Sequence, residues 1–503
     1  MPAFLHDDAL SLILGACSIS TLAAASRVSS RMRYLAMPHL LHTVYLKCTD
    51  DQIISFCSFI IVNASKFNAE SHPESFGPGK YIRNLELLNR TRGYCEYVTD
   101  SEYSERNPSA AWTQLLTQAL GFMPNLLTFL SLAYDIDDFI KPSPQFAQAL
   151  LSLPRLEILT LKGIGPETSK AIAGGIDMMG DSINLKLKQL ILFGKQEWVS
   201  DILVVAGDGV KRLLYLSRVH LISLELAFFS FMNVDGGWAN TAEVTFPNVV
   251  FAAIHGDGMP IKPMASAFPA VRFLDIQTDV SCLRHNIRPS SANILFPSLT
   301  SISGSYSEIY HILKHNLARS RVLRVVIGDD WSKDRVSAEA QPLRISMIAP
   351  HLKCIVFRQR FIRPLSWWKE FGSSLPNMIY MSVNLQIRSE AKWNLLCKDI
   401  PGALGAMQLR CLTVVAYKYD RKYCGTNSIY TEEDAFALSY GKSIPTLEYF
   451  EFKIPGFIRG TSWIKFIRKG DETLLQKLSL TWNEEVALRN SYDYQGTYDT
   501  EKS

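Results

Sequence analysis

The sequence lacks the features that mark an exported or membrane-embedded protein. Near its start it carries Asp7 and Asp8, where a secretory signal needs basic residues ahead of an apolar run. Its longest apolar runs, such as IISFCSFIIV, are well short of the roughly 18 residues that span a bilayer. Its nine cysteines contain no Cys-x-x-Cys pair, which favours a reducing compartment. We therefore expect a soluble protein of the cytoplasm or nucleus, with no membrane contact.

A strong charge imbalance and catalytic motifs are missing as well. The 52 Lys and Arg against 48 Asp and Glu leave a formal charge of +4, which is too small to attract a polyanion, so we expect no nucleic-acid partner. There is no Gly-x-Ser-x-Gly elbow, no Walker loop and no His-Glu-x-x-His motif. We expect that the chain is not an enzyme and needs no cofactor or metal.

Three local patterns hint at chemistry, and we interpret each one as structural. His311 and His315 share a helical face, but isoleucine follows His311 where a zinc protease needs Glu, and no third ligand is near. Cys282 and His285 have a spacing that arises by chance. The segment GDGVKR at 207–212 lacks the preceding strand and the full glycine spacing of a phosphate loop.

What the sequence does contain is a repeated strand pattern. An apolar residue, two variable positions, an apolar residue, one variable position and a further apolar residue recur, often with Pro two places ahead. Successive copies lie about 30 residues apart, close to the usual length of a leucine-rich repeat. The fourteen copies are anchored at Ile82, Leu127, Leu156, Leu187, Leu221, Val249, Val271, Leu299, Val322, Leu352, Met378, Leu412, Leu447 and Leu475.

Between these strands lie stretches whose apolar residues recur at spacings of three and four, which predicts helices. Pro then ends each helix and sets the preceding residue to an extended conformation. The clearest stretches are SAAWTQLLTQALG (109–121), SPQFAQALLSL (143–153), SEIYHILKHNLA (307–318), SWWKEFGSSL (366–375), EEDAFALSYGKSI (432–444) and TSWIKFIRKG (461–470).

Together these patterns predict an α/β fold, an irregular leucine-rich-repeat solenoid with a curved parallel sheet and helices on its convex side. An ordinary doubly wound sheet is the alternative, because it too alternates strands and helices. The short strands, the recurring Pro and the absence of a Gly-rich turn after an early strand favour the solenoid.

Ahead of the repeats, the segment PAFLHDDALSLILGACSISTLAAASRVSSRMRYLAMPHLLHTVYL predicts a small all-α module of two or three helices. This module resembles an F-box, and the chain over nearly its whole length resembles the fungal F-box and leucine-rich-repeat proteins. His6 stands where the family usually has Pro. The residues that carry the resemblance are Leu5, Asp7, Asp8, Leu10, Ile13 and Leu14 for the opening LPxDlLxxIL element, Leu22 for the second helix, and SRVSSRMRYLA (26–36) for the xRVxRxxRxLA stretch.

The resemblance implies a substrate-recognition subunit of a cullin-type E3 ubiquitin ligase. The F-box would dock a Skp-type adaptor, the repeats would bind an unknown substrate protein, and catalysis would belong to the partners. The alternative is a leucine-rich-repeat protein-binding scaffold whose degenerate F-box only caps the repeats. The residues expected to contact the adaptor are Leu5, Leu10, Ile13, Leu14, Leu22 and Val28.

The expected organisation is an F-box-like module at 1–46, a helical linker or N-terminal cap at 47–81, about fourteen repeats at 82–485 and a polar tail at 486–503. Alternation along the strands places every second residue on the face opposite the helices. Among those positions, the residues expected to bind the substrate protein are Arg358, Tyr380, Asn384, Lys418, Glu451 and Lys453.

Overall fold

The computed structural model divides the chain into two compact units. Unit 1 comprises residues 1–249 and 255–259, and unit 2 comprises residues 250–254 and 260–503. The residues that the structure describes are 6–47, 50–69, 77–88, 110–132, 135–180, 183–195, 204–205, 207–230, 245–256, 261–277, 295–316, 321–328, 348–360, 363–387, 389–418, 428–453, 461–470 and 472–493.

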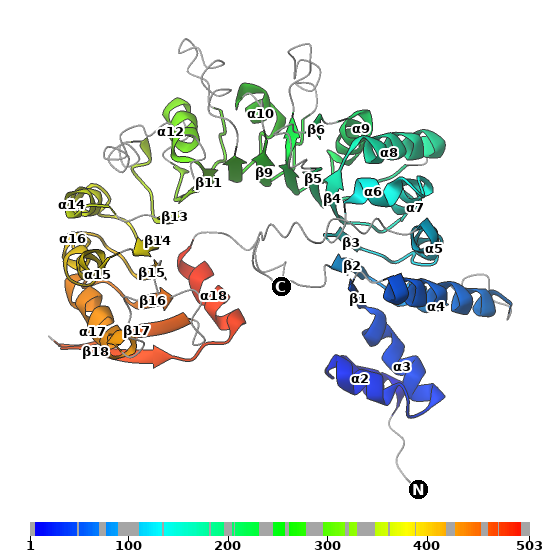
Figure 1. Ribbon diagram of the computed structural model, residues 1–503, viewed down its shortest axis with the longest axis horizontal. Helices are drawn as coiled ribbons and strands as arrows, with labels where there is room; N and C mark the ends of the chain where they lie inside the picture. The colour runs from blue at the N-terminus through cyan, green and yellow to red at the C-terminus, as the bar shows by residue number, and fades with distance from the viewer. Residues whose placement is uncertain are drawn as a thin grey trace, which may run out of the picture. The chain divides into compact units, whose positions relative to one another are not determined.

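Unit 1 begins with a module of three short helices, drawn in dark blue in Figure 1. These are α1 (Asp7–Gly15), α2 (Ile19–Ala25) and α3 (Ser30–Leu41). The side chains of Ser18 and Ser29 accept backbone N–H bonds at the starts of α2 and α3, which satisfies donors that a helix leaves open at its first turn. Helix α3 runs almost directly into strand β1 (Thr43–Lys47), so the sheet begins inside the segment expected to belong wholly to the module.

The rest of unit 1 alternates strands and helices. Strands β1, β2, β3, β4, β5 and β7 pair in that order, all parallel. The further strands are β2 (Asn84–Leu88), β3 (Thr128–Ser131), β4 (Ile158–Ile164), β5 (Gln189–Gly194), β7 (Ser223–Ala227) and the short pair β6 (Val204–Val205) and β8 (Phe229–Ser230). The helices are α4 (Asp50–Ala69), η1 (Gly77–Tyr81), α5 (Ala110–Leu120), α6 (Ile136–Ile140), α7 (Gln145–Leu151), α8 (Pro166–Met179) and α9 (Asp208–Ser217).

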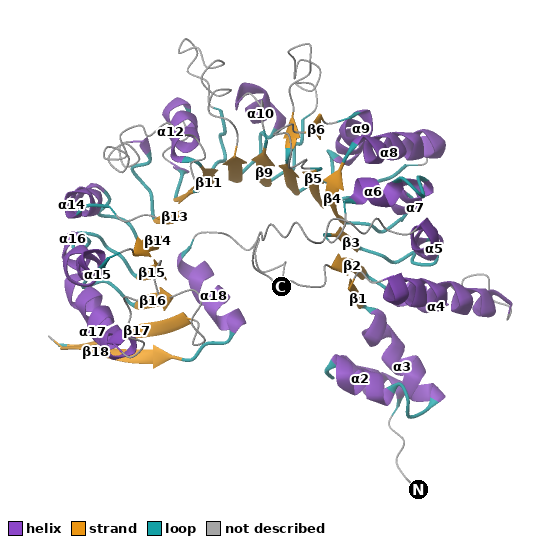
Figure 2. Ribbon diagram, viewed as in Figure 1, coloured by secondary structure: helices purple, strands orange, loops and turns teal. Residues whose placement is uncertain are grey.

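Helices α5 and α7 to α9 of unit 1 pack on one face of its sheet, as Figure 2 shows. Leucine and phenylalanine side chains from neighbouring strands stand in register on that face, for example Leu85, Phe129 and Leu159, and all three are fully buried. Phe139 lies between two further aromatic rings, 4.8 Å from Trp112 and 4.6 Å from Phe146 by ring centroids. The core of unit 1 is therefore a dry layer between strands and helices.

Unit 2 continues the same alternation. Its strands from β9 to β16 pair in chain order and parallel wherever the register is given, and β16, β17 and β18 then pair antiparallel. The strands are β9 (Phe251–His255), β10 (Phe273–Gln277), β11 (Ser301–Gly304), β12 (Arg324–Ile327), β13 (Cys354–Arg360), β14 (Tyr380–Ile387), β15 (Cys411–Lys418), β16 (Tyr449–Lys453), β17 (Thr461–Lys469) and β18 (Glu472–Leu478). The helices are α10 (Ile261–Ala267), α12 (Tyr306–His315), α14 (Leu365–Ser374), α15 (Glu390–Asn394), the π-helix η6 (Leu395–Asp399), α16 (Ile400–Ala403), α17 (Ser428–Ser443) and α18 (Trp482–Tyr492).

Each of the fourteen predicted anchors lies in a strand or one to two residues before it, and the strands are β2 to β5, β7, β9 to β16 and β18. The protein is therefore a mixed α/β protein in which short parallel strands alternate with helices, consistent with a leucine-rich-repeat solenoid. The five predicted helices before residue 461 are also present, as α5, α7, α12, α14 and α17.

Two predictions at the end of the chain were wrong. The stretch 461–470, predicted as a helix, is strand β17, in which Trp463 faces one side of the sheet while Ile464 and Phe466 are buried on the other. Its apolar residues fit either period, and pairing with β16 and β18 selects the strand. The start of the expected polar tail lies within helix α18, which begins at a capping box of Thr481 and Glu484.

Candidate functional site

The N-terminal module has a small core of its own. Leu14 from α1, Leu22 from α2, and Leu35 and Ala36 from α3 are buried against one another. Leu10 packs partly buried on this cluster. The module thus has a small apolar core formed by its own three helices.

The six residues expected to contact an adaptor fall into three groups. Leu14 and Leu22 form the module core, with Leu10 against it. Ile13 and Val28, by contrast, are 53% and 76% exposed. Leu5 lies outside the described residues. Further large apolar side chains exposed on the module are Leu12, Ile19 and Tyr34. The sequence pattern therefore marked both the residues that hold the module together and two that are free to contact a partner.

The second candidate surface is the inner face of unit 2, defined as the face of strands β12 to β17 opposite helices α12, α14 and α17. Strand register places its side chains in two rows that cross the strands. The first row is Arg324, Cys354, Tyr380, Cys411, Tyr449 and Lys465, and the second is Val326, Val356, Ser382, Thr413, Glu451 and Trp463.

Three of the expected substrate-binding residues are accessible on this face. Arg358 is exposed and its guanidinium lies 4.0 Å from the carboxylate of Asp275 on β10. The Asn384 amide donates a 2.9 Å hydrogen bond to the backbone carbonyl of Arg358. Lys453 is half-buried at the end of β16. Lys418 ends β15, and its side chain lies outside the described part of the structure.

The other two expected residues, Tyr380 and Glu451, point to the inner face but are only 3% and 1% exposed. Helix α18, drawn in red in Figure 1, covers them. Both carboxylate oxygens of Glu451 accept bonds from the guanidinium of Arg489, and Oε2 also accepts a 2.9 Å bond from Thr413. The alternation of strand residues thus indicates that both side chains point to the inner face. The sequence of these strands does not indicate that a helix covers them.

The end of α18 is held by a second buried ion pair. The carboxylate of Asp493 accepts bonds of 2.6 and 3.2 Å from Nε and Nη2 of Arg324, a two-pronged geometry that suits guanidinium and carboxylate. The thiol of Cys354 donates a 2.9 Å bond to the same carboxylate. Burial alone lowers the pKa of Arg324, but the hydrogen bond and the charge of Asp493 outweigh it and raise the pKa above its ordinary value.

A third contact joins the last turn of α18 to the residue just before β16. The hydroxyl of Tyr492 donates a 2.6 Å bond to Glu448, which also receives a 2.7 Å bond from Arg410. The bond from Arg410 is the main cause that lowers the pKa of Glu448. The last turn of α18 therefore contacts the sheet through three charged and polar groups, beside a limited apolar contact of Leu488 and Tyr492.

Several patterns singled out as possible metal or catalytic sites can be placed in the structure. Among the described residues, no group of three or more His, Cys, Asp or Glu side chains could hold a metal. His311 and His315 lie with ring centroids 5.1 Å apart on α12. Burial raises the pKa of both the Cys354 and Cys411 thiols well above the ordinary value, which leaves them protonated and unreactive. Cys282 and His285 fall outside the described residues.

The segment GDGVKR is the start of a helix. Helix α9 begins at Asp208, and Arg212 forms a 2.7 Å ion pair with Asp177 on α8. The Ser169 side chain accepts a bond from the backbone N–H of Gly209, and a side chain at that glycine would collide with the backbone of Ser169. The glycine serves the close packing of α9 against α8 rather than a phosphate.

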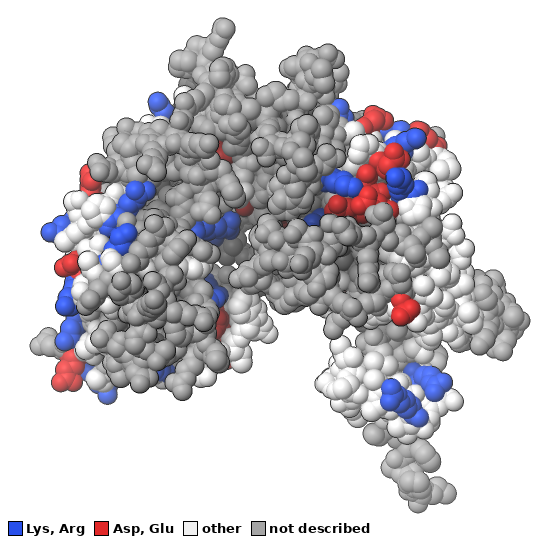
Figure 3. Space-filling view, viewed as in Figure 1, with Lys and Arg blue, Asp and Glu red and all other residues white. Residues whose placement is uncertain are grey.

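Figure 3 shows acidic and basic side chains gathered on one part of unit 1. In the same unit, Asp138 and Lys195 form a 2.9 Å ion pair. Asp137 beside them is buried and accepts bonds from the backbone N–H groups of Gly165 and Thr168, so it caps α8. These interactions join α6 to the start of α8 and to the residue after β5.

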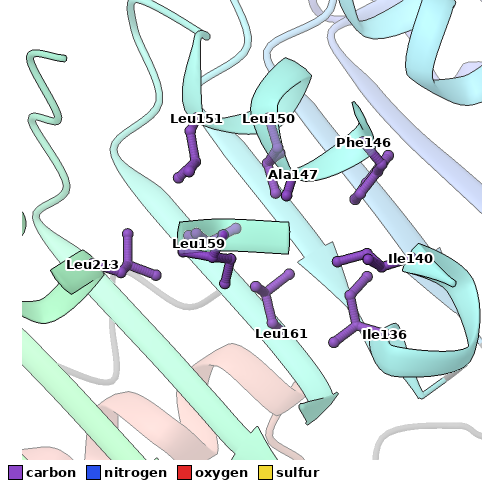
Figure 4. A pocket seen from close by; sticks show the side chains of 10 residues that line it. Ile136, Ile140, Phe146, Ala147, Leu150, Leu151, Leu159, Leu161 and Leu213 are labelled. Atoms are coloured by element: carbon purple, nitrogen blue, oxygen red, sulfur yellow. The ribbon is translucent and has the colours of Figure 1, made fainter. Parts of the chain in front are cut away.

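One cavity of unit 1 is shown in Figure 4. It lies between α6, α7, α8, α9 and β4, and none of its lining residues has a polar side-chain atom to orient a ligand. The cavity is an imperfection of core packing. Its lining consists of Ile136, Ile140, Phe146, Ala147, Leu150, Leu151, Leu159, Leu161, Ile172 and Leu213.

The repeated strands and helices define the class of protein, a mixed α/β repeat protein whose architecture is consistent with a leucine-rich-repeat solenoid. Among solved structures, the chain is similar to the leucine-rich repeat-containing protein LegL7 from Legionella pneumophila, with 10% sequence identity, coverage of 67% of this chain and 98% of that chain, and a TM-score of 0.32. No protein-family model and no curated protein matches the chain. Of the helices that the structure describes, none has the length and apolar character needed to cross a membrane.

Proposed function

We propose that the chain is a substrate-recognition subunit of a cullin-type E3 ubiquitin ligase. The N-terminal module docks a Skp-type adaptor, the repeat sheet binds the substrate protein, and the partner subunits carry out catalysis. The observation that carries the proposal is the apolar surface of the module, where Ile13 and Val28 stand exposed beside a core that is already complete.

Apolar side chains exposed to water are unfavourable in free energy, and a partner that buries them makes the complex more stable. Burying one large aliphatic side chain stabilises a complex by about 1.5 to 3 kcal/mol. The module exposes Leu12 and Ile19 as well as Ile13 and Val28, four such side chains on a unit of three short helices and their connecting turns. This concentration of apolar surface on a small unit supports a protein-docking role.

The sheet supplies a surface suited to a polar protein epitope. Arg358, Asn384 and Lys453 remain accessible on the inner face of unit 2. Asp275 lies beside Arg358, so both signs of charge are present. A partner with complementary charges would gain specificity and a faster encounter rate from such a pattern.

A different observation favours the alternative, a protein-binding scaffold without a ligase. Helix α3 ends at Leu41 and β1 begins at Thr43. Tyr34 on α3 interacts with Tyr81 in η1, whose pKa is raised by burial and by this neighbour. The module is thus joined to the first repeats, as a cap would be.

Adaptor capture decides between the two functions. The full chain and its Ile13→Asp/Val28→Asp variant are tested for retention of a purified Skp-type adaptor. Both positions are exposed, so the variant keeps its core and should fold. The matched control is Met178→Asp, at an apolar position on α8 that is 67% exposed.

The ligase proposal predicts that the adaptor is retained by the unaltered chain and by the control, and that the double variant loses at least about a hundredfold in affinity, because two apolar contacts become buried charges. Failure of the unaltered, folded chain to retain the adaptor would remove the ligase role and leave the scaffold.

A further inference from the structure

Helix α18 occupies the inner face of unit 2 as a ligand would. Its last turn carries Arg489, Tyr492 and Asp493, and each of the three contacts a different place on the sheet. Arg489 meets Glu451 on β16, whereas Asp493 meets Arg324 on β12. Figure 1 shows α18 on the side of the strands opposite α14 and α17.

The side chains of the sheet that contact α18 also interact with side chains of neighbouring strands. Thr413 donates to Glu451, and Tyr380 lies within 3.4 Å of the Thr413 hydroxyl. Arg324 also donates a 3.3 Å bond to Ser301 on the neighbouring strand. Partners on the sheet therefore help to hold these side chains in position. The site has a negative charge at Glu451 and a positive charge at Arg324.

Helix α18 is attached to the sheet differently from the other helices of unit 2. No residue of α18 itself is buried, whereas α14 buries Trp367, Trp368 and Phe371. Leu488 and Tyr492 pack only partly buried on Cys354, Tyr380, Cys411 and Trp463. The attachment thus combines polar and ionic contacts with a limited apolar one. Because no residue of α18 is buried, α18 can leave the sheet without opening the packing between the strands and α14.

We propose that the inner face of β12 to β16 is a binding site for a helical segment of a partner protein that carries Arg four residues before Asp or Glu, and that α18 is the intramolecular occupant of this site. A basic residue at the first position meets Glu451 and a carboxylate one turn later meets Arg324. The segment from Leu478 to Trp482 joins α18 to β18, so the helix stays tethered beside the site. A partner must therefore compete with a high local concentration of α18.

This inference rests on the proposed protein-binding role of the repeat sheet, and it is independent of adaptor docking. The two proposals concern different residues, Ile13 and Val28 on the module and Glu451 and Arg324 on the sheet. A variant altered only in α18 should retain the adaptor as well as the unaltered chain does. The adaptor and peptide assays can therefore succeed or fail separately.

The test releases α18 without touching the sheet. The released variant of the full chain is Arg489→Glu/Asp493→Arg, which turns both ion pairs into repulsive contacts. The matched control is Ala487→Glu/Ser491→Arg, which places the same two charges at exposed positions of the same helix. The probe is a fluorescein-labelled peptide with the sequence of residues 480–493, followed by fluorescence anisotropy.

The released variant should bind the peptide at least about tenfold more tightly than the unaltered chain or the control, because its site is vacant. A peptide with the two charges exchanged should not bind. Hydrogen exchange of the full chains should show loss of protection at 482–492 in the released variant alone.

Three results would each overturn the proposal. The first is a released helix with no gain in peptide binding. The second is equal binding of the charge-exchanged peptide, which would mean apolar adhesion without recognition. The third is an α18 that stays protected in the released variant, because the ionic contacts would then not hold the helix on the sheet.

Discussion

The two faces of the sheet in unit 2 are stabilised by different physics. On the helix side, Trp367 and Phe371 stack with ring centroids 5.0 Å apart above a layer of buried aliphatic residues. On the inner side, α18 is attached through Arg324 with Asp493 and Arg489 with Glu451. The hydrophobic effect does not depend on direction. An ion pair between a guanidinium and a carboxylate, by contrast, fixes the relative position of its two partners.

This difference separates stability from recognition within one sheet. Removal of water from apolar surface gives the larger part of a fold's free energy. A buried ion pair gives little net stability because desolvation offsets its attraction, but it fixes register. The helix side thus holds the repeats together, while the inner side determines what lies on them.

The largest expected effect comes from the helix side. Trp368 is fully buried, so Trp368→Ala should lower the free energy of unfolding by about 3 to 5 kcal/mol, through lost burial and a residual cavity. Urea denaturation followed by circular dichroism measures this. Trp482→Ala, at an exposed position of α18, should change the same quantity by less than about 0.5 kcal/mol. Similar losses for both variants would contradict the distinction between the faces.

A smaller effect is expected on the inner side. Asp493→Ala removes the partner of Arg324, and should cost about 1 to 3 kcal/mol, less than the tryptophan, because α18 can lift away and let water reach the guanidinium. Hydrogen exchange should show lost protection at 482–492 with the repeat strands still protected. Uniform loss across unit 2 would show instead that α18 belongs to the cooperative core.

The smallest effect is a dependence on pH. The pKa of Glu448 is lowered from 4.5 by its bonds from Arg410 and Tyr492, so the stability it contributes is present above pH 4.5 and is lost as pH falls through the lowered value. The pKa of Tyr492 is raised from 10.0 by burial and by Glu448, so its contribution is present below pH 10.0 and is lost at higher pH.

Protection of residues 482–492 should therefore be greatest between these two limits. Hydrogen exchange corrected for the intrinsic effect of pH measures it. Glu448→Gln should flatten the acidic limb and leave the repeat strands unchanged. An acidic limb that persists in this variant would assign the dependence to another group.

The repeats were predictable from sequence because their signal is local and recurs. Anchors such as Leu352 and Met378 sit at the same place in each unit, and the strands follow. The helix predicted at 461–470 was wrong because the apolar spacing there fits a strand as well as a helix. Only the partners β16 and β18, which are set by long-range pairing, resolve that ambiguity.

The candidate sites were predictable only in part, for a related reason. The alternation of strand residues placed Tyr380 and Glu451 on the inner face correctly. Both residues are covered by α18, which lies far along the chain. Arg489 is 38 residues from its partner Glu451, and Asp493 is 169 residues from its partner Arg324. The sequence around Glu451 does not indicate so distant a partner. Helix α18 itself has a polar composition that is typical of a tail.

The reversal of strand direction after β16 has a consequence for association between molecules. Parallel repeats leave an unpaired strand at the end of a sheet, where another chain can add and begin an aggregate. Here β17 and β18 turn back antiparallel, and the outermost strand β18 carries Glu472, Gln476 and Lys477 as exposed polar residues. Lys477 is also engaged by Asp434 at 2.8 Å. The sheet thus ends on a charged edge strand that disfavours stacking of one molecule on the next.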